Sequence, residues 1–343
     1  MANLVYPPAV RPGGTIGVPS PSSGVDSEFA PRLADATNAL TARRYRVELG
    51  TLVRNGGLVS GSISERVDEL QTMFARDDVN AVLPPWGGEL AIDMLDTLDW
   101  AALAADPKWF AGWSDISTLL LPLTVMHGVA TLHGANLMDE PYELPTEFVR
   151  WTDVISGTVG TSFEQQAAPH RRTRPWGDWA DEPLDAAKAY ETTTHWKLLS
   201  GASQAEFSGR LIGGCLDTVA LLAATPYGDV PAFQRRYAPE GLVVYLEVSD
   251  ADAVSTARML RSLRLAGWFT NANGVLIGRT TAPNSADMTQ LEAVAHALGD
   301  LPIPVIVDFD AGHEPPQMPL VNGAIADVRI DGRHGSIRQT LTP

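Results

Sequence analysis

The segment Lys108-Trp-Phe-Ala-Gly-Trp-Ser-Asp-Ile-Ser-Thr-Leu-Leu-Leu-Pro122 is the stretch that says most about the fold of this chain. A short strand-like run ends at Gly112, and a continuous apolar helix pattern begins just after Asp115. Ser114 lies at the turn between them, where its hydroxyl would be exposed beside the first free N–H groups of the helix. Serine and aspartate before an apolar run also describe an ordinary helix N-cap, so this segment alone leaves both interpretations open.

Two residues further along the chain favour a nucleophile at Ser114. Glu247 ends a strand-like run at 242–247, and His313 follows an apolar run at 303–309. An acid and an imidazole at the ends of two strands can converge on one edge of a sheet, where a base and its orienting carboxylate are needed beside the serine. The chain order Ser, acid, His therefore predicts a hydrolytic site.

Apolar patterns predict short strands that alternate with helices along most of the chain. In the first half, strands are expected near 15–18, 46–49, 81–84 and 109–112, and helices near 28–43, 64–77, 89–104 and 115–127. In the second half, strands are expected near 209–214, 242–247, 275–279 and 305–309, and helices near 215–223, 250–266 and 288–298. Such alternation indicates parallel sheets covered on both faces. We expect an α/β protein with an N-terminal Rossmann-like domain at 1–140, a second α/β domain at 208–343, and the site between them.

The segment at 141–207 breaks this alternation. It is rich in proline and polar residues and contains Trp176 and Trp179. A stretch of this length with little periodicity is either a linker or a functional lid. The tryptophans favour a lid that covers a ligand, although they could also pack the loop onto the body of the protein. The basic cluster His170-Arg-Arg-Thr-Arg174 is expected to be a solvated loop.

Composition excludes several classes of protein. A formal net charge of −16 argues against binding a nucleic-acid polymer, but it is compatible with a small nucleotide-like ligand in one pocket. No run of about 18 apolar residues occurs, and the N-terminus lacks a secretory pattern, so we expect a cytoplasmic protein that does not enter the membrane. Cys215, the single cysteine, is expected to be a small buried residue rather than a zinc ligand.

Gly87 and Gly88 follow the third expected strand. An oxyanion hole needs backbone N–H groups close to the developing charge, and a missing Cβ lets the chain approach the substrate. The same pair would also suit an ordinary strand-to-helix turn. It is not part of a dinucleotide-binding or P-loop pattern, so no nucleotide cofactor is implied.

Three other residues fit structural roles better than chemical ones. His133 is interpreted as a core histidine or one that supports the site from behind, and Asp308 and Asp310 as strand-end and turn residues. No histidine or carboxylate occurs at helical ligand spacing, so no metal site is expected.

Eight segments, in this order, resemble the family of LD-carboxypeptidases and microcin C self-immunity serine peptidases. They are Gly14-Thr-Ile-Gly-Val-Pro-Ser-Pro-Ser-Ser, Trp86-Gly-Gly, Gly112-Trp-Ser-Asp-Ile-Ser, Gly213-Gly-Cys-Leu-Asp, Thr225-Pro-Tyr, Tyr245-Leu-Glu, Gly274-Val-Leu-Ile-Gly-Arg and Gly312-His-Glu-Pro-Pro. The resemblance covers about residues 10–325 and implies an N-terminal domain similar to class I amidotransferases, together with a homodimeric assembly.

Carried over by position, the resemblance implies Ser114 as nucleophile, with Glu247 and His313 as its partners. It also implies an oxyanion hole from the backbone N–H groups of Gly88 and Asp115, with Gly87 beside the substrate. Glu89 departs from the family pattern, which usually has an aromatic residue or Asn there, and this departure bears on substrate selectivity.

Three function classes follow: a serine peptidase or amidase, a non-catalytic binding protein on the same scaffold, and an amidotransferase-like enzyme. The last is disfavoured because its nucleophile would be a cysteine at the position of Ser114. Within the first class, the long segment with Trp176 and Trp179 favours a small peptidyl- or aminoacyl-nucleotide substrate over a murein tetrapeptide, because an indole can stack on a nucleobase.

Overall fold

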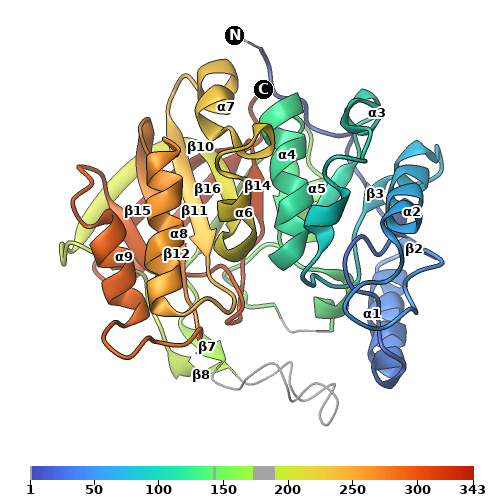
Figure 1. The fold of residues 1–343 in the computed structure, drawn as a ribbon, viewed down its shortest axis with the longest axis horizontal. Helices are drawn as coiled ribbons and strands as arrows, with labels where there is room; N and C mark the ends of the chain where they lie inside the picture. Colours follow the sequence, from blue (N-terminus) through green and yellow to red (C-terminus); the bar gives the residue numbers. More distant parts are fainter. Residues whose placement is uncertain (1, 142–143, 173–189) are drawn as a thin grey trace.

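The structure is a computed structural model that describes residues 2–141, 144–172 and 190–343. Its strands form a six-stranded sheet, an eight-stranded sheet and a separate two-stranded sheet. Helices lie beside both larger sheets, and α4 and α6 lie between the two halves of the molecule (Figure 1). The protein is therefore α/β, with a parallel-sheet N-terminal part and a second α/β part, as the strand and helix patterns predicted.

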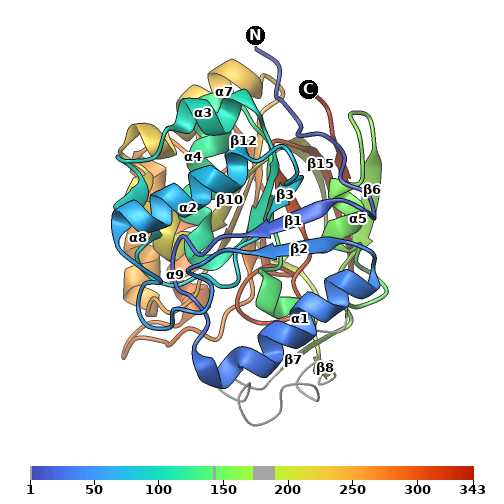
Figure 2. The ribbon, with the colours of Figure 1, turned by 90° about the vertical axis from the view of Figure 1, so that its right-hand side faces the viewer.

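The first sheet has the order β14-β5-β4-β3-β1-β2, and only β14 is antiparallel to its neighbour. Its strands are β1 (Thr15–Val18), β2 (Arg46–Leu49), β3 (Ala81–Val82), β4 (Trp109–Gly112), β5 (Thr131–His133) and β14 (Leu320–Asn322). The helices of this half are α1 (Ala30–Ala42), α2 (Ile63–Ala75), α3 (Trp100–Ala105), α4 (Ser117–His127) and α5 (Trp151–Ile155). Figure 2 shows α1 and α2 beside the β1 and β2 edge of the sheet.

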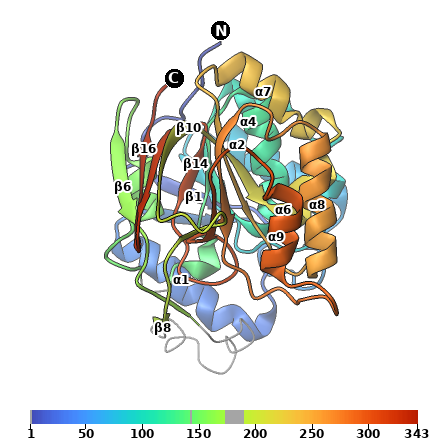
Figure 3. The ribbon, with the colours of Figure 1, turned by 90° about the vertical axis from the view of Figure 1, so that its left-hand side faces the viewer.

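The second sheet has the order β6-β16-β15-β10-β11-β12-β13-β9, with parallel pairing from β10 to β13. Its strands are β6 (Ser162–Gln166), β9 (Lys197–Leu198), β10 (Gln204–Cys215), β11 (Leu242–Glu247), β12 (Ala272–Gly278), β13 (Val305–Phe309), β15 (Ile325–Asp331) and β16 (His334–Thr340). The helices of this half are α6 (Leu216–Leu222), α7 (Val230–Tyr237), α8 (Ala253–Leu265) and α9 (Gln290–Leu298). Figure 3 shows β6 and β16 at one edge and α8 and α9 on the opposite side.

Helix α4 is the central element of the core. Every residue from Ser117 to Val125 is buried, as expected for a helix that is apolar all round. It packs against α6, α7 and β10 of the second half, so the two halves share one hydrophobic cluster. The helix ends at Gly128, which has the left-handed conformation common at helix C-termini (φ 69°).

The structure departs from the sequence-based prediction in several elements, and β5, β14, β15, β16, α5 and α7 were not predicted. The helix expected at 89–104 is interrupted, and short helical turns at Ala91–Met94 and Trp100–Ala105 replace it. The described part of 141–207 contains strands that the patterns did not predict: β6 and β9 pair with the second sheet, and β7 (His170–Arg172) pairs with β8 (Tyr190–Thr193). Within the described ranges, no helix is long and apolar enough to cross a membrane.

Candidate active site

Ser114 lies on a sharp turn between β4 and the helical segment that continues into α4. Its backbone has φ 59°, in the left-handed region that serine rarely adopts. Gly112, two residues earlier, has φ 155°, and a Cβ there would lie 2.8 Å from Ile116. The strained serine raises its hydroxyl at the carboxyl end of the first sheet, which is the geometry of a nucleophile elbow.

His313 and Glu247 meet Ser114 in one hydrogen-bonded row. The Nε2 atom of His313 lies 3.0 Å from the Ser114 Oγ atom, and its Nδ1 atom lies 2.8 Å from Glu247 Oε2. Glu247 is fully buried at the end of β11, whereas His313 follows β13 and is partly exposed. The structure thus brings together the three residues that the chain order singled out.

Opposite effects act on the pKa values of this pair. Burial disfavours the imidazolium and lowers the pKa of His313. Attraction to Glu247, the hydrogen bond with it and the charges of Asp250 and Asp217 together outweigh burial and raise the pKa above the ordinary value of 6.5. Burial raises the pKa of Glu247, but His313, with smaller contributions from His133 and Cys215, more than compensates, so the net shift is downward. Glu247 is therefore suited to stabilise the imidazolium that forms when His313 accepts a proton.

Gly87 and Gly88 lie against the serine turn. A Cβ on Gly87 would lie 2.8 Å from Ser114 Cβ and 3.3 Å from the backbone N of Asp115. Gly88 has φ 140°, and a Cβ there would lie 2.3 Å from Ser22 Oγ. This close approach to Ser114 and Ser22 leaves no room for a side chain at Gly87 or Gly88.

The Asp115 side chain fixes this arrangement. Its carboxylate accepts hydrogen bonds from Ser22 Oγ (2.6 Å) and from the backbone N of Ala91 (2.8 Å). Its own backbone N lies in the first turn of the helical segment, where N–H groups have no partner within the helix. The segment after β1 and the segment after Gly88 are thus tied to the elbow.

A cavity of about 410 Å³ opens above Ser114. Its described lining comprises Ser23, Gly24, Asp26, Phe29, Gly57, Trp86, Gly87, Gly88, Trp113, Ser114, Asn136, Asp139 and His313. Asp26 and Asp139 are the lining residues with acidic side chains, and none of this described lining is lysine or arginine.

Trp113 is a site residue that the sequence analysis did not single out. Its ring lies 4.3 Å from that of His313, centroid to centroid, and its Nε1 atom donates to Asp139 Oδ2 at 2.7 Å. Burial raises the pKa of Asp139 to about 6, although hydrogen bonds from Asn136 and Trp113 oppose the shift. The sequence signals for Trp113 were its position next to Ser114 and its place in a segment that carries the family resemblance.

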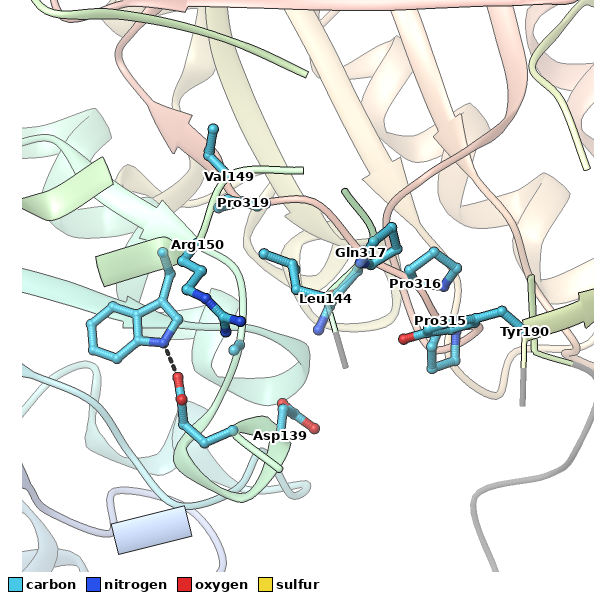
Figure 4. A pocket seen from close by; sticks show the side chains of 13 residues that line it. Asp139, Leu144, Val149, Arg150, Tyr190, Pro315, Pro316, Gln317 and Pro319 are labelled. Atoms are coloured by element: carbon cyan, nitrogen blue, oxygen red, sulfur yellow. Dashed lines mark hydrogen bonds between the residues drawn. The ribbon is translucent and has the colours of Figure 1, made fainter. Parts of the chain in front are cut away.

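A smaller cavity of about 80 Å³ shares Asp139 with the first one. Figure 4 shows it between the labelled residues Leu144, Val149 and Pro319 on one side and Pro315 and Tyr190 on the other. It lies beside the segment that follows His313, and its lining is mainly apolar.

Cys215 is buried, as expected, but it adjoins the site. Its Sγ atom, a Glu247 carboxylate oxygen and a ring nitrogen of His313 lie within 4.8 Å of one another, which is close enough for a metal ion to be shared. Both ring nitrogens of His313 already contact Glu247 and Ser114, so a metal at this point would have to displace one of those hydrogen bonds. The observed contacts fit a proton relay better than a metal site.

The other sequence-based interpretations have mixed outcomes. His133 is buried behind the site, 3.5 Å from Ser117 Oγ, and burial lowers its pKa to about 4. The expectation of a solvated basic loop is wrong for the described part of that cluster: Arg171 forms an ion pair with Glu314, and Arg172 is buried. Trp176, Trp179 and Arg174 lie outside the described residues.

Asp308 near the end of β13 and Asp310 just after it occupy a strand end and a turn, as interpreted, and each also forms an ion pair. Asp308 forms an ion pair with exposed Lys197. Asp310 is completely buried and forms an ion pair with Arg279. Arg279 lies at the end of a segment that carries the family resemblance, but no sequence pattern pairs it with Asp310.

A serine, an imidazole and a buried carboxylate in one hydrogen-bonded row define a serine hydrolase by class. Comparison with known proteins gives the family. Residues 16–134 match the LD-carboxypeptidase N-terminal domain, and residues 208–328 match the LD-carboxypeptidase C-terminal domain. The chain therefore belongs to the LD-carboxypeptidase family and is a serine carboxypeptidase-type hydrolase.

Relatives of two kinds resemble this chain. The murein tetrapeptide carboxypeptidase of Pseudomonas aeruginosa is 32% identical over 66% of this chain and 67% of its own length. The microcin C7 self-immunity protein MccF of Escherichia coli is 24% identical over 98% of this chain and 96% of its own length.

Solved structures share the fold. The crystal structure of an MccF-like protein from Bacillus anthracis has a TM-score of 0.80 at 23% identity and covers 99% of this chain and 100% of that one. MccF in complex with glutamyl sulfamoyl guanosine has a TM-score of 0.75 at 20% identity, with 100% of both chains covered.

Proposed function

We propose that this protein hydrolyses the bond between an aminoacyl or peptidyl group and a modified nucleotide, with Ser114, His313 and Glu247 as its catalytic triad. The observation that carries this proposal is the hydrogen-bonded row from Ser114 Oγ through His313 to Glu247. In this role the enzyme would detoxify such conjugates, as a self-immunity protein does.

In the proposed mechanism, His313 Nε2 accepts the Ser114 hydroxyl proton while Oγ attacks the scissile carbonyl carbon. The oxyanion that forms is held by the backbone N–H groups of Gly88 and Asp115. The imidazolium then protonates the leaving group, the carbonyl reforms, and the nucleotide part departs. Water, deprotonated by His313, hydrolyses the acyl-enzyme and restores the serine.

The charge of the cavity favours an aminoacyl conjugate over a murein tetrapeptide. A tetrapeptide ends in a carboxylate, and the described lining has Asp26 and Asp139 but no lysine or arginine to pair with it. An aminoacyl group instead carries an α-ammonium next to the scissile carbonyl, which acidic residues attract. The complexes of MccF with glutamyl sulfamoyl guanosine and with aspartyl sulfamoyl adenosine support ligands of this chemistry for the fold.

The first test is hydrolysis of an aminoacyl-sulfamoyl adenosine by wild type and Ser114→Ala, followed by chromatography of the released nucleoside. We expect turnover by the wild type and a loss of at least about 10³-fold in the variant, because Oγ is the atom that forms the bond. His313→Ala should be similarly severe. Melting temperatures of the variants should stay close to that of the wild type, and a fully active Ser114→Ala protein would refute the mechanism.

The runner-up function is that of an LD-carboxypeptidase in cell-wall recycling, which the 32% identical relative favours. Wild type, Trp176→Ala and Trp179→Ala should be assayed in parallel on the nucleotide conjugate and on a murein tetrapeptide. If an indole stacks on the base, its loss should raise KM for the conjugate by about 5- to 100-fold and leave tetrapeptide hydrolysis unchanged. Cleavage of the tetrapeptide alone by the wild type would establish the runner-up instead.

The same proposal includes a homodimer that acts in the cytoplasm on a small substrate, without a metal or cofactor. Light scattering at micromolar protein concentration tests the dimer, and a mass equal to that of one chain would contradict it. Activity that survives treatment with a chelator tests the metal-free mechanism.

A further inference from the structure

The turn that carries His313 is wrapped around one buried guanidinium. Arg279, directly after β12, is 3% exposed and forms an ion pair with Asp310, which precedes His313. Its Nη2 atom donates to the backbone O atoms of Pro316 (2.7 Å) and Glu314 (3.3 Å), which follow His313. One side chain therefore holds both ends of the turn.

The carboxylate of Asp310 is fixed from its other side. Its Oδ2 atom accepts hydrogen bonds from Trp196 Nε1 (2.7 Å) and from the backbone N of Ala168 (3.0 Å). Asp310 is fully buried, so Arg279 has a partner that cannot rotate away into solvent.

The same turn is in contact with Glu247. A Cβ on Gly312 would lie 2.8 Å from Glu247 Cβ, and so would a Cβ on Gly278, the residue before Arg279. The backbone of Arg279 also donates to Phe309 O at 3.0 Å. Arg279 thus fixes the His313 turn against the strand that carries its carboxylate partner.

Stability alone is a weak reason for such a pair, because removing two charges from water costs about as much as their attraction returns. A planar guanidinium does, however, reach several acceptors in a fixed geometry, which an ammonium cannot reproduce. Placing a base within a few tenths of an ångström of a serine requires this kind of fixed geometry.

We infer that Arg279 and Asp310 are positioning residues that hold His313 in line between Ser114 and Glu247. This inference rests on the proposed role of His313 as general base. It assigns a role to two residues that touch neither the cavity above Ser114 nor the reacting atoms.

Arg210 provides a matched control. It is 4% exposed, pairs with Glu240, and donates to the backbone O atoms of Gly323 and Thr342 at 2.7 Å each. It lies on β10 five positions before Cys215, roughly 17 Å along the strand from the site. Arg279→Lys and Arg210→Lys therefore each replace a buried guanidinium that pairs with a carboxylate and donates to two backbone oxygens. Only Arg279 lies beside the turn that carries His313.

The experiment measures how fast a fluorophosphonate reagent labels Ser114, between pH 5 and 9 and at a temperature where every variant is folded. We expect Arg279→Lys and Asp310→Asn to be labelled about 10- to 100-fold more slowly than wild type, and Arg210→Lys within about threefold of it. The midpoint of the pH profile should fall toward the ordinary histidine value only in the first two variants, because His313 would lose its close contact with Glu247. NMR titration of the His313 ring should show the same downward shift.

Equal losses in Arg279→Lys and Arg210→Lys, or an unchanged His313 midpoint in Arg279→Lys, would overturn the positioning role. These readouts do not depend on the substrate. A wild type that is labelled but ignores the aminoacyl conjugate contradicts the proposed substrate and leaves the positioning comparison intact. A wild type that is not labelled contradicts the proposed triad, and the NMR titration of His313 then decides the positioning role.

Discussion

At the scale of single residues, backbone strain is found at Ser114, the residue proposed to act as nucleophile. Ser114 adopts φ 59°, which costs an ordinary residue about 1–2 kcal/mol, and the buried helix α4 that begins three residues later holds it there. The glycines around it are placed where a Cβ would collide with Ser114, Ser22 or Glu247. The strain and the close packing together fix where the hydroxyl points.

The raised pKa of His313 leads to a prediction about pH. Only the neutral imidazole can accept the serine proton, so kcat/KM should fall as pH drops through a midpoint above 6.5. Glu247→Gln removes the charge that raises this pKa, so its midpoint should lie lower than that of the wild type, with at least about 100-fold less activity. A kcat/KM profile from pH 5 to 9 checks both parts, and an equal or higher midpoint in Glu247→Gln would contradict them.

The same shifts determine how this pair contributes to stability. The folded-state pKa of His313 is raised, so its contribution is complete below the ordinary value of 6.5 and is lost as pH rises through the folded value. The folded-state pKa of Glu247 is lowered, so its contribution is present above the ordinary value of 4.5 and is lost as pH falls through the folded value. The ion pair therefore stabilises the fold most between pH 4.5 and pH 6.5. In this range the imidazole is charged and cannot act as a base.

Gly88→Ala tests the oxyanion hole. Gly88 has φ 140°, and the new Cβ would lie 2.3 Å from Ser22 Oγ. The backbone should therefore shift, and the N–H of residue 88 should no longer point at the oxyanion. We expect kcat/KM to fall about 10²- to 10³-fold, as for the loss of one oxyanion donor. Gly13→Ala is the control, because Gly13 has φ 104° but no neighbour within 4 Å of a Cβ. It should lose stability and keep kcat, and similar kinetics for both variants would argue against the hole.

At the scale of elements, sequence patterns predicted the helices and strands whose apolar residues follow one another or recur regularly along the chain. Four of the five parallel strands of the first sheet, β1 to β4, and the central helix α4 were predicted. For β1, β3, β4 and α4 the signal was a short apolar run, because these elements are buried. Three-residue strands such as β5 and β14 have no periodicity to detect, since their pairing depends on contacts far away in sequence. β15 does alternate buried and exposed residues, and this alternation was the available signal for it.

The residues of the candidate site likewise include some that sequence patterns predicted and some that they did not. The residues of the proposed triad could be predicted because Ser114, Glu247 and His313 each lie at or shortly after the end of a recognisable strand. The Arg279–Asp310 pair could not, because a buried ion pair depends on the fold that surrounds it and not on any local pattern. The identity of Asp310 suggested a turn residue, and only its complete burial reveals its other role.

Strand β14 leads to a prediction through Asn322. Its Oδ1 atom accepts hydrogen bonds from Tyr245 OH (2.8 Å) and from the backbone N of Gly213 (3.1 Å), so it joins the first sheet to the second. Asn322→Leu should lower the free energy of unfolding by about 1–3 kcal/mol, because it leaves buried donors unsatisfied. Exposed Asn271→Ala should change it by less than about 0.5 kcal/mol. Urea denaturation of both variants is the measurement, and equal effects would contradict the linking role.

At the scale of the whole molecule, the two sheets are interdependent. β14 follows most of the second sheet in sequence yet completes the first sheet, whereas β6 precedes β10 in sequence and pairs with β16 at the far edge of the second sheet. The apolar face of α4 is covered by α6 and α7 from the second half. Each half would therefore expose its part of the shared hydrophobic cluster when the other is absent.

We therefore expect a chain divided after Ser203 to give no independently folded half. Residues 1–203 would lack β14 and would expose the α4 residues that pack on α6 and α7, while residues 204–343 would lack β6 and β9. Unfolding of the full chain, followed by circular dichroism and by intrinsic fluorescence, should be a single transition with coincident midpoints. The fragments should unfold without cooperativity and be digested rapidly by proteases. A fragment 1–203 that melts cooperatively near the temperature of the full chain would show that the first sheet is a self-sufficient domain and that α4 does not need the second half.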